Sequence, residues 1–270
     1  MCQQKLTKMT KFEYQFALIT GASSGIGKSF AYLLAQKGVN LVLTARSEDK
    51  LVQIADELKA KFNINVICIK ADLSEINAPQ MIFDEIVKHN ISIDLLINNA
   101  GIGKWTNFLD ESIDSYQAMI QLNITSLMTL TQLFLPKMLQ NKKGGIINIA
   151  STGALQPCPY IAVYCATKSF VLNFSESLHG EYFDKGITVT AICPGNTQTD
   201  FQKTAHANTK GMSFESPDEV AKQSIEALLK RQNNKIIGFN NVLQSFIPRL
   251  FPRKTVINIV KNMMNQKVNG

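Results

Sequence analysis

The sequence of 270 residues lacks the features that mark several special classes of protein. No stretch approaches the ~18 consecutive apolar residues that a membrane-spanning helix needs. Residues 1–13 are polar and Lys-rich with no apolar core, so we predict no secretory signal and a cytoplasmic protein. The composition of 45% hydrophobic and 18% charged residues excludes a disordered or collagen-like chain.

The cysteines form no C-x-x-C pair. Their number is odd, and the five are Cys2, Cys68, Cys158, Cys165 and Cys193. This pattern favours free thiols in small structural positions, as in a reducing cytoplasm, over disulfides, a metal site or a redox pair. We therefore predict no metal.

Acidic residues are missing from the last part of the chain. After Glu226 there is none, whereas eight basic residues follow: Lys230, Arg231, Lys235, Arg249, Arg253, Lys254, Lys261 and Lys267. The rest of the chain carries 20 basic against 21 acidic residues, so the net charge of +7 belongs to the C-terminal tail. A nucleic-acid-binding protein needs a basic face on its main domain, and we predict no such partner.

Short apolar runs alternate with longer segments of helical periodicity. Strands are predicted at 16–19, 41–43, 66–69, 94–97, 146–149 and 187–192, and helices lie between them, among them 48–62, 78–89 and 110–140. Strands that are apolar on both faces are typical of a parallel sheet covered by helices on both sides. We predict a single α/β domain with a doubly wound parallel sheet of about seven strands. Residues 1–13 form an N-terminal extension, and residues 201–270 form a substrate lid and the basic tail.

A glycine-rich turn, Thr20-Gly21-Ala22-Ser23-Ser24-Gly25-Ile26-Gly27, joins the first strand to the first helix. Glycine permits positive φ and lets the backbone approach a pyrophosphate, whose charge the helix N-terminus stabilises. The spacing G-x-x-x-G-x-G differs from the commoner G-x-G-x-x-G of dinucleotide-binding proteins, and a simple tight turn is the alternative.

The same segment also matches G-x-S-x-G, the context of a hydrolase nucleophile. In that alternative Ser23 would attack the substrate and a histidine would activate it. Only His89, His179 and His206 are available, and none stands in a position that clearly suits this role.

The second predicted strand ends at Arg46, 19 residues after Gly27. At about this distance dinucleotide enzymes contact the adenine ribose. An acid there accepts the 2′-hydroxyl of NAD, and an arginine suits the 2′-phosphate of NADP. Residues 44–46 contain no acid, so we predict that NADP(H) is preferred over NAD(H), although Glu48 and Asp49 follow closely. An ordinary solvated charge is the alternative for Arg46.

Tyr164 and Lys168 form a Y-x-x-x-K motif after the fifth strand. The i,i+4 spacing places both side chains on one helix face. Lowering a tyrosine pKa from ~10 by ~3 units needs about 4 kcal/mol of preference for the phenolate. We expect the lysine to supply much of this and so to make Tyr164 an acid/base group.

Together these motifs resemble the short-chain dehydrogenase/reductase family over nearly the whole chain. Further matches are Ala71-Asp72-Leu73, Asn98-Asn99-Ala100-Gly101, Asn123, Ser151 and Pro194-Gly195. Ser151 follows Asn123 by 28 residues and precedes Tyr164 by 13, and both intervals are similar to those of the family's catalytic tetrad. Ala150 stands where many members have a second serine. The resemblance implies a Rossmann-like fold and an enzyme that interconverts a carbonyl and an alcohol. It also implies a homodimer or homotetramer packed through two long central helices.

The resemblance further implies a role for each matching residue. Tyr164 would be the general acid/base, Ser151 would hold the substrate oxygen, and Lys168 would lower the tyrosine pKa and bind the nicotinamide ribose. Asn123 would orient a water for a proton relay, or be only a helix-kink residue. The cofactor would contact Gly21, Ser23, Ser24, Gly25, Ile26, Gly27, Arg46, Asp72, Leu73, Asn98, Ala100, Gly101, Tyr164, Lys168, Pro194, Gly195, Thr197 and Thr199. A sensor that binds NADPH without turnover is the remaining alternative.

The predicted substrate pocket is apolar and suits a hydrophobic ketone or alcohol. Ser151 and Tyr164 would contact the substrate, with walls from Ile102, Trp105, Leu155, Pro157, Pro159, Phe201, Met212 and Phe214. Residues 202–216 would form a mobile lid. In the tail, one helical stripe comprises Val256, Ile257, Val260, Met263 and Met264. With Phe246, Ile247, Leu250 and Phe251, this tail would touch an anionic membrane, guide an acyl substrate, or pack on the body or a sister subunit.

Overall fold

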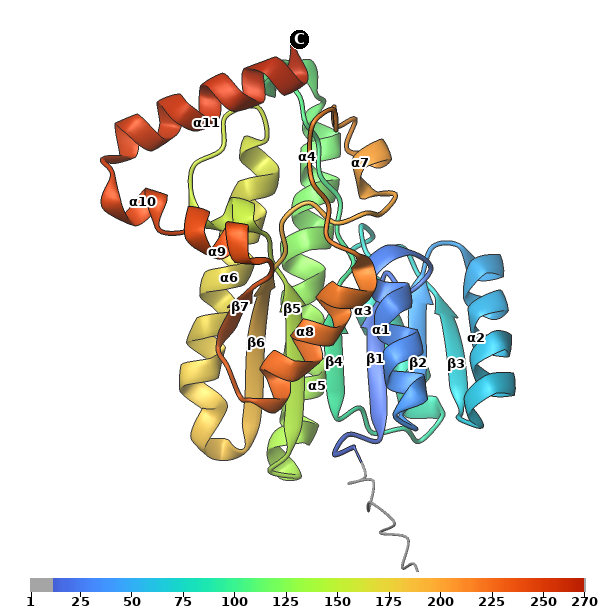
Figure 1. The fold of residues 1–270 in the computed structure, drawn as a ribbon. Helices are drawn as coiled ribbons and strands as arrows, with labels where there is room; N and C mark the ends of the chain where they lie inside the picture. Colours follow the sequence, from blue (N-terminus) through green and yellow to red (C-terminus); the bar gives the residue numbers. More distant parts are fainter. Residues whose placement is uncertain (1–11, 270) are drawn as a thin grey trace, which may run out of the picture.

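A computed structural model describes residues 12–269 as one doubly wound α/β domain (Figure 1). Its seven parallel strands have the order β3-β2-β1-β4-β5-β6-β7, which confirms the predicted fold class. The strands are β1 (Phe16–Thr20), β2 (Asn40–Ala45), β3 (Val66–Lys70), β4 (Leu95–Asn98), β5 (Gly144–Ile149), β6 (Ile187–Cys193) and β7 (Asn234–Ile236). Most of the predicted N-terminal extension lies outside the described residues.

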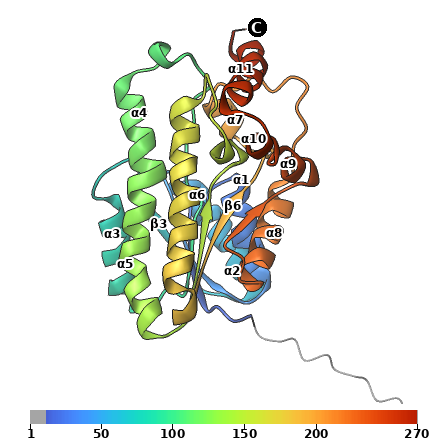
Figure 2. The same cartoon turned by 90° about the vertical axis from the view of Figure 1, so that its left-hand side faces the viewer.

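Helices cover both faces of the sheet (Figure 2). On one face lie α1 (Gly25–Gln36), α2 (Glu48–Phe62) and α8 (Pro217–Leu229), and on the other lie α3 (Ala78–Lys88), α5 (Leu127–Gln140) and α6 (Ala162–Tyr182). The two layers bury separate apolar clusters because the central strands are apolar on both faces. Because all strands run parallel, their carboxyl ends lie together at one edge of the sheet.

The helix predicted for residues 110–140 is not uniform. A short 3₁₀ turn (Phe108–Asp110) precedes α4 (Ile113–Ile120), and a π-helical segment (Gln121–Ser126) joins α4 to α5. The combined stretch Ile113–Gln140 is long and apolar enough to cross a membrane. However, α5 packs Leu130, Phe134 and Met138 into the core beside the sheet, as a core helix does. The π-helical segment turns Asn123 inward, as such local distortions do at many functional sites.

The C-terminal segment forms a cap above the strand ends, on the side of β6 (Figure 1). It comprises α9 (Phe239–Gln244), α10 (Ile247–Leu250) and α11 (Arg253–Val268), whereas the short α7 (Phe201–Thr204) lies between β6 and α8. In α11 the buried residues are Val256, Val260 and Met264, which pack on the body beside Tyr164. Of the predicted stripe, Ile257 and Met263 are exposed, because only the i, i+4, i+8 row faces the body.

Candidate active site

A cleft of about 1220 Å³ opens at the carboxyl ends of the strands. The loops after β1, β2, β4, β5 and β6 line it, together with residues of α9 and α11. In open parallel sheets this edge is where ligands bind. Part of the predicted substrate lid, residues 211–215, also lines the cleft.

The glycine-rich turn is built for close backbone approach. Gly21 and Gly25 have φ of +66° and +52°, a region that favours glycine. A methyl group on Gly27 would lie 2.3 Å from the carbonyl oxygen of Gly21, so this position admits no side chain. The start of α1 faces the cleft through Gly25 and Ile26. This cradle fits a diphosphate at a helix N-terminus.

The turn is locked to the loop after β4 by hydrogen bonds. The Thr20 hydroxyl accepts from the amides of Asn99 and Ala100, both at 2.9 Å. The Asn99 side chain donates to the carbonyl of Thr20 at 2.8 Å. Asn99 lines the cleft, whereas its neighbour Asn98 was the residue predicted to contact the cofactor.

Arg46 lies at the end of β2 with a largely exposed guanidinium. It reaches to 3.9 Å of the Asp72 carboxylate, which also accepts from the hydroxyl of Ser74 at 2.7 Å. Glu48, the acid nearest to Arg46 in the sequence, pairs instead with Lys70 at 3.4 Å. Lys50, in the first turn of α2 and four residues after Arg46, lines the cleft as well. This end of the cleft therefore presents two cations.

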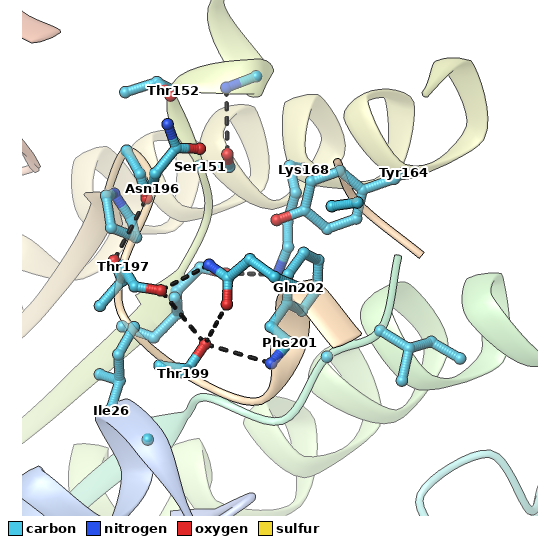
Figure 3. A pocket seen from close by; sticks show the side chains of 18 of the residues that line it. Ile26, Ser151, Thr152, Tyr164, Lys168, Asn196, Thr197, Thr199, Phe201 and Gln202 are labelled. Carbon is cyan, nitrogen blue, oxygen red and sulfur yellow. Dashed lines mark hydrogen bonds between the residues drawn. The ribbon is translucent and has the colours of Figure 1, made fainter. Parts of the chain in front are cut away.

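Ser151, Tyr164 and Lys168 line the same cleft, and Lys168 lies next to Gly101 in the loop after β4. Figure 3 shows the tyrosine and lysine side chains pointing into the same cavity, with Phe201 beside the tyrosine ring. The lysine ammonium lies 5.8 Å from the centroid of that ring and donates to the carbonyl of Ile149 at 2.7 Å. The Ser151 hydroxyl accepts from the Gly153 amide at 3.1 Å.

Burial sets the acidity of both groups. Burial raises the pKa of the Tyr164 phenol far above its usual value, while the hydrogen bond with Ser151 opposes this rise. The structure thus gives the opposite direction to the lowering that we expected from Lys168. Burial also lowers the pKa of Lys168 to about 8, so the ammonium itself is weakened as a partner. The phenol is protonated at neutral pH.

Asn123 lies behind this group and does not line the cleft. Its side-chain amide donates to the carbonyl of Ile102 at 2.9 Å and to the hydroxyl of Thr167 at 3.0 Å, and its oxygen accepts from the Ile102 amide at 3.0 Å. A methyl group on Gly101 would lie 3.3 Å from both the Asn123 oxygen and the Lys168 nitrogen. The predicted tetrad is therefore assembled in one place.

The other predicted cofactor residues line the cleft, except Gly27 and Asn98, and so do the predicted substrate residues, except two of the walls. The Asn98 side chain is in the core, where it donates to Thr131 at 3.2 Å and Asn148 at 2.9 Å. Two predicted walls, Pro157 and Pro159, are also absent from the cleft, since the intervening Cys158 faces it.

Among the residues that shape the site, Lys50 and Gly103 were not predicted, in addition to Asn99. Lys50 carries a signal in the sequence, because it is a cation four residues after Arg46. Gly103 carries none, because only the fold shows that a methyl group there would lie 2.7 Å from Phe201 and 2.9 Å from the Tyr164 ring.

The hydrolase alternative finds no support in this geometry. None of the three histidines lines the cleft that contains Ser23. The His179 ring contacts the carbonyl of Val189 at 2.8 Å, and His89 pairs with Glu85 at 3.4 Å. Ser23 therefore has no base beside it.

The fold and the glycine cradle define a dinucleotide-binding oxidoreductase of the doubly wound class. Residues 15–210 match the family model described as short chain dehydrogenase. The chain belongs to this family of enzymes, which act on carbonyl and alcohol groups.

Named relatives and solved structures agree with this assignment. The chain is 36% identical over 257 residues to the human "Very-long-chain 3-oxoacyl-CoA reductase", covering 92% of this chain and 79% of that one. It is 38% identical to the mouse "17-beta-hydroxysteroid dehydrogenase type 3", covering 78% and 68% of the two chains. A short-chain dehydrogenase from Sphingobium yanoikuyae, solved in complex with NADPH, has a TM-score of 0.80 at 29% identity and covers 90% and 94%.

Proposed function

We propose that the protein is an NADP(H)-dependent reductase of hydrophobic carbonyl compounds, with Tyr164 as the proton donor. The observation that carries this proposal is the position of Tyr164, Ser151 and Lys168 in the same cleft as the glycine cradle. A buried phenol that stays protonated at neutral pH suits a general acid in carbonyl reduction.

Each residue has a defined task in this proposal. Bound NADPH supplies the hydride. The Ser151 hydroxyl, which accepts a hydrogen bond from the Gly153 amide, would donate its own hydrogen to the substrate oxygen as negative charge develops there. Tyr164 then transfers its proton to that oxygen. The Lys168 ammonium, close to Gly101 and Asn123, stabilises the phenolate that remains and is placed to contact the nicotinamide ribose.

The cofactor preference rests on the cations at the end of β2. Arg46 and Lys50 would bind a 2′-phosphate, while Glu48 is turned to Lys70. The NADPH complex of the Sphingobium protein supports this choice. We expect Arg46→Asp to reduce the preference for NADPH over NADH by at least about tenfold, measured as kcat/KM with each cofactor. An unchanged ratio would remove Arg46 from cofactor selection.

The substrate proposal rests on an apolar lining near the tyrosine, from Trp105, Leu155, Phe201, Met212 and Phe214. The names of the relatives point to two lipidic carbonyls, a 3-oxoacyl thioester and a steroid ketone. We favour the thioester and test it by following NADPH absorbance with both classes. Turnover of 3-oxoacyl thioesters that rises with chain length supports the proposal, and turnover of small polar ketones alone would contradict it.

The chain is further proposed to form a homodimer or homotetramer through α4, α5 and α6. Exposed apolar side chains on α4 (Ile113 and Ile120) and on α5 (Met128) support this. Light scattering after size exclusion measures the mass, and a monomer at micromolar concentration would contradict the proposal. The cytoplasmic location stays a prediction, to be checked by cell fractionation.

A further inference from the structure

Large apolar side chains gather on one corner of the C-terminal cap. We call this the apolar corner, and it consists of Phe239, Leu243, Phe246, Ile247, Leu250 and Phe251. Phe239 and Leu250 are 79% and 75% exposed, and Leu243 and Phe251 are 61% and 52% exposed. Such a patch on a soluble surface marks an interaction site. In Figure 1 it lies around α9 and α10, which form the outer edge of the cap, away from α2.

The charged residues of the segment that carries this corner have one sign, and the Glu215 carboxylate beside Gly238 comes from another part of the chain. Arg249, Arg253 and Lys254 are all exposed and lie within or beside the corner. Among residues 12–269 none of these three takes part in an ion pair. No acidic residue follows Glu226, so the segment that carries the corner is uniformly basic. A partner surface for this corner is therefore both apolar and anionic.

We propose that the apolar corner docks on the surface of a bilayer containing anionic lipid. Phenylalanine and leucine side chains enter the boundary between headgroups and acyl chains, while neighbouring arginine and lysine side chains contact the lipid phosphates. A second copy of this chain fits less well. A two-fold interface on this corner would bring two patches of the same positive charge together, with no acid from this segment to offset them.

The corner adjoins the mouth of the cleft. Asn241 and Gln244 of α9 line the cleft, whereas Leu243, on the same helix, is exposed on the corner. In α11, Val260 and Met264 line the cleft from the inside. A docked bilayer therefore lies next to the opening through which a substrate enters. That consequence rests on the proposed function, whereas the docking itself does not.

Sedimentation with lipid vesicles tests the docking, using the full chain. We expect binding to vesicles of phosphatidylcholine with phosphatidylglycerol and little binding to phosphatidylcholine alone. Leu250→Ser with Phe251→Ser removes two exposed side chains, and we expect at least about tenfold weaker binding. Arg249→Gln with Lys254→Gln should weaken binding and reduce its dependence on salt.

Matched variants control for general effects of substitution. Ile76→Ser with Val87→Ser changes two side chains of the same exposure, 78% and 53%, on another part of the surface. Lys137→Gln with Lys142→Gln removes two exposed lysines elsewhere. Both should bind vesicles like the unmodified protein, and all four should reduce a short soluble ketone at the unmodified rate. This readout separates failure of the docking from failure of the reductase proposal.

Three results would overturn the docking. They are equal binding by the Leu250→Ser/Phe251→Ser protein, absence of binding to anionic vesicles, and a fall in oligomeric mass of that variant without vesicle binding by the unmodified chain. The last result would assign the corner to a second copy of the protein.

Discussion

Gly103 is the residue whose substitution tests the geometry beside Tyr164 most sharply. It is buried and does not line the cleft. A methyl group at this position would lie 2.7 Å from Cζ of Phe201, and 2.9 Å and 3.2 Å from two atoms of the Tyr164 ring. Carbon atoms in contact stay about 3.5–4.0 Å apart, so both rings must move by about half an ångström or more.

The two rings differ in how they can respond. Phe201 meets the methyl group with the far end of its ring and can swing away at small cost. Tyr164 meets it close to its Cγ, near the backbone of α6, so its hydroxyl must shift with the ring. A misplacement of about 1 Å in an active site can slow a reaction by about 100-fold. We therefore expect Gly103→Ala to lower kcat by about 10- to 100-fold.

The assay follows NADPH oxidation at saturating cofactor and measures kcat and KM separately. We expect the loss mainly in kcat, with unchanged NADPH affinity and about 1–3 kcal/mol lower stability from overpacking. Gly180→Ala is the control, because nothing lies within 4 Å of a methyl group there. Adding Phe201→Leu should not restore the rate if the displaced tyrosine is the cause. A wild-type kcat for Gly103→Ala would show that the methyl group does not displace the Tyr164 hydroxyl.

Three further predictions concern charge and packing. Because burial lowers the pKa of Lys168 to about 8, its positive charge is lost as pH rises through that value, and kcat/KM for reduction should fall above it; a flat pH profile would contradict this. Asn98→Ala should lower the free energy of unfolding in urea by about 1–3 kcal/mol, because it leaves Asn148 without its donor, while NADPH affinity stays unchanged. Val260→Asp buries a charge beneath α11 and should lower both the melting temperature and kcat, unlike Ile259→Asp at an exposed position.

The fold was predictable where periodicity is strong. The bounds predicted for α2, residues 48–62, coincide with those of the structure, since its apolar stripe and flanking polar residues are regular. The edge strand β7 was not located, because Asn234-Lys235-Ile236 has one apolar residue and its pairing with β6 is long-range. The π-helical segment within residues 110–140 was not predicted for a similar reason. It turns Asn123 toward Ile102, and this contact with a residue outside the helix cannot be recognised from the helical periodicity.

The candidate site was predictable from motifs, and details of orientation and acidity were not. Asn98 and Asn99 adjoin each other at the end of a strand, and only the structure decides which of the two faces the cleft. The direction of the Tyr164 pKa shift was wrong because spacing reveals that a lysine is near, but not how deeply both groups are buried.

We propose that the Tyr164 hydroxyl delivers the proton in carbonyl reduction, and removal of this hydroxyl tests the proposal. Tyr164→Phe keeps the ring against Phe201, whose centroid lies 5.3 Å away, and removes only that hydroxyl. We expect steady-state NADPH oxidation with a carbonyl substrate to fall by at least about 100-fold, while NADPH binding measured by calorimetry is unchanged. A variant that retains most of the turnover, with the same pH profile, would contradict it.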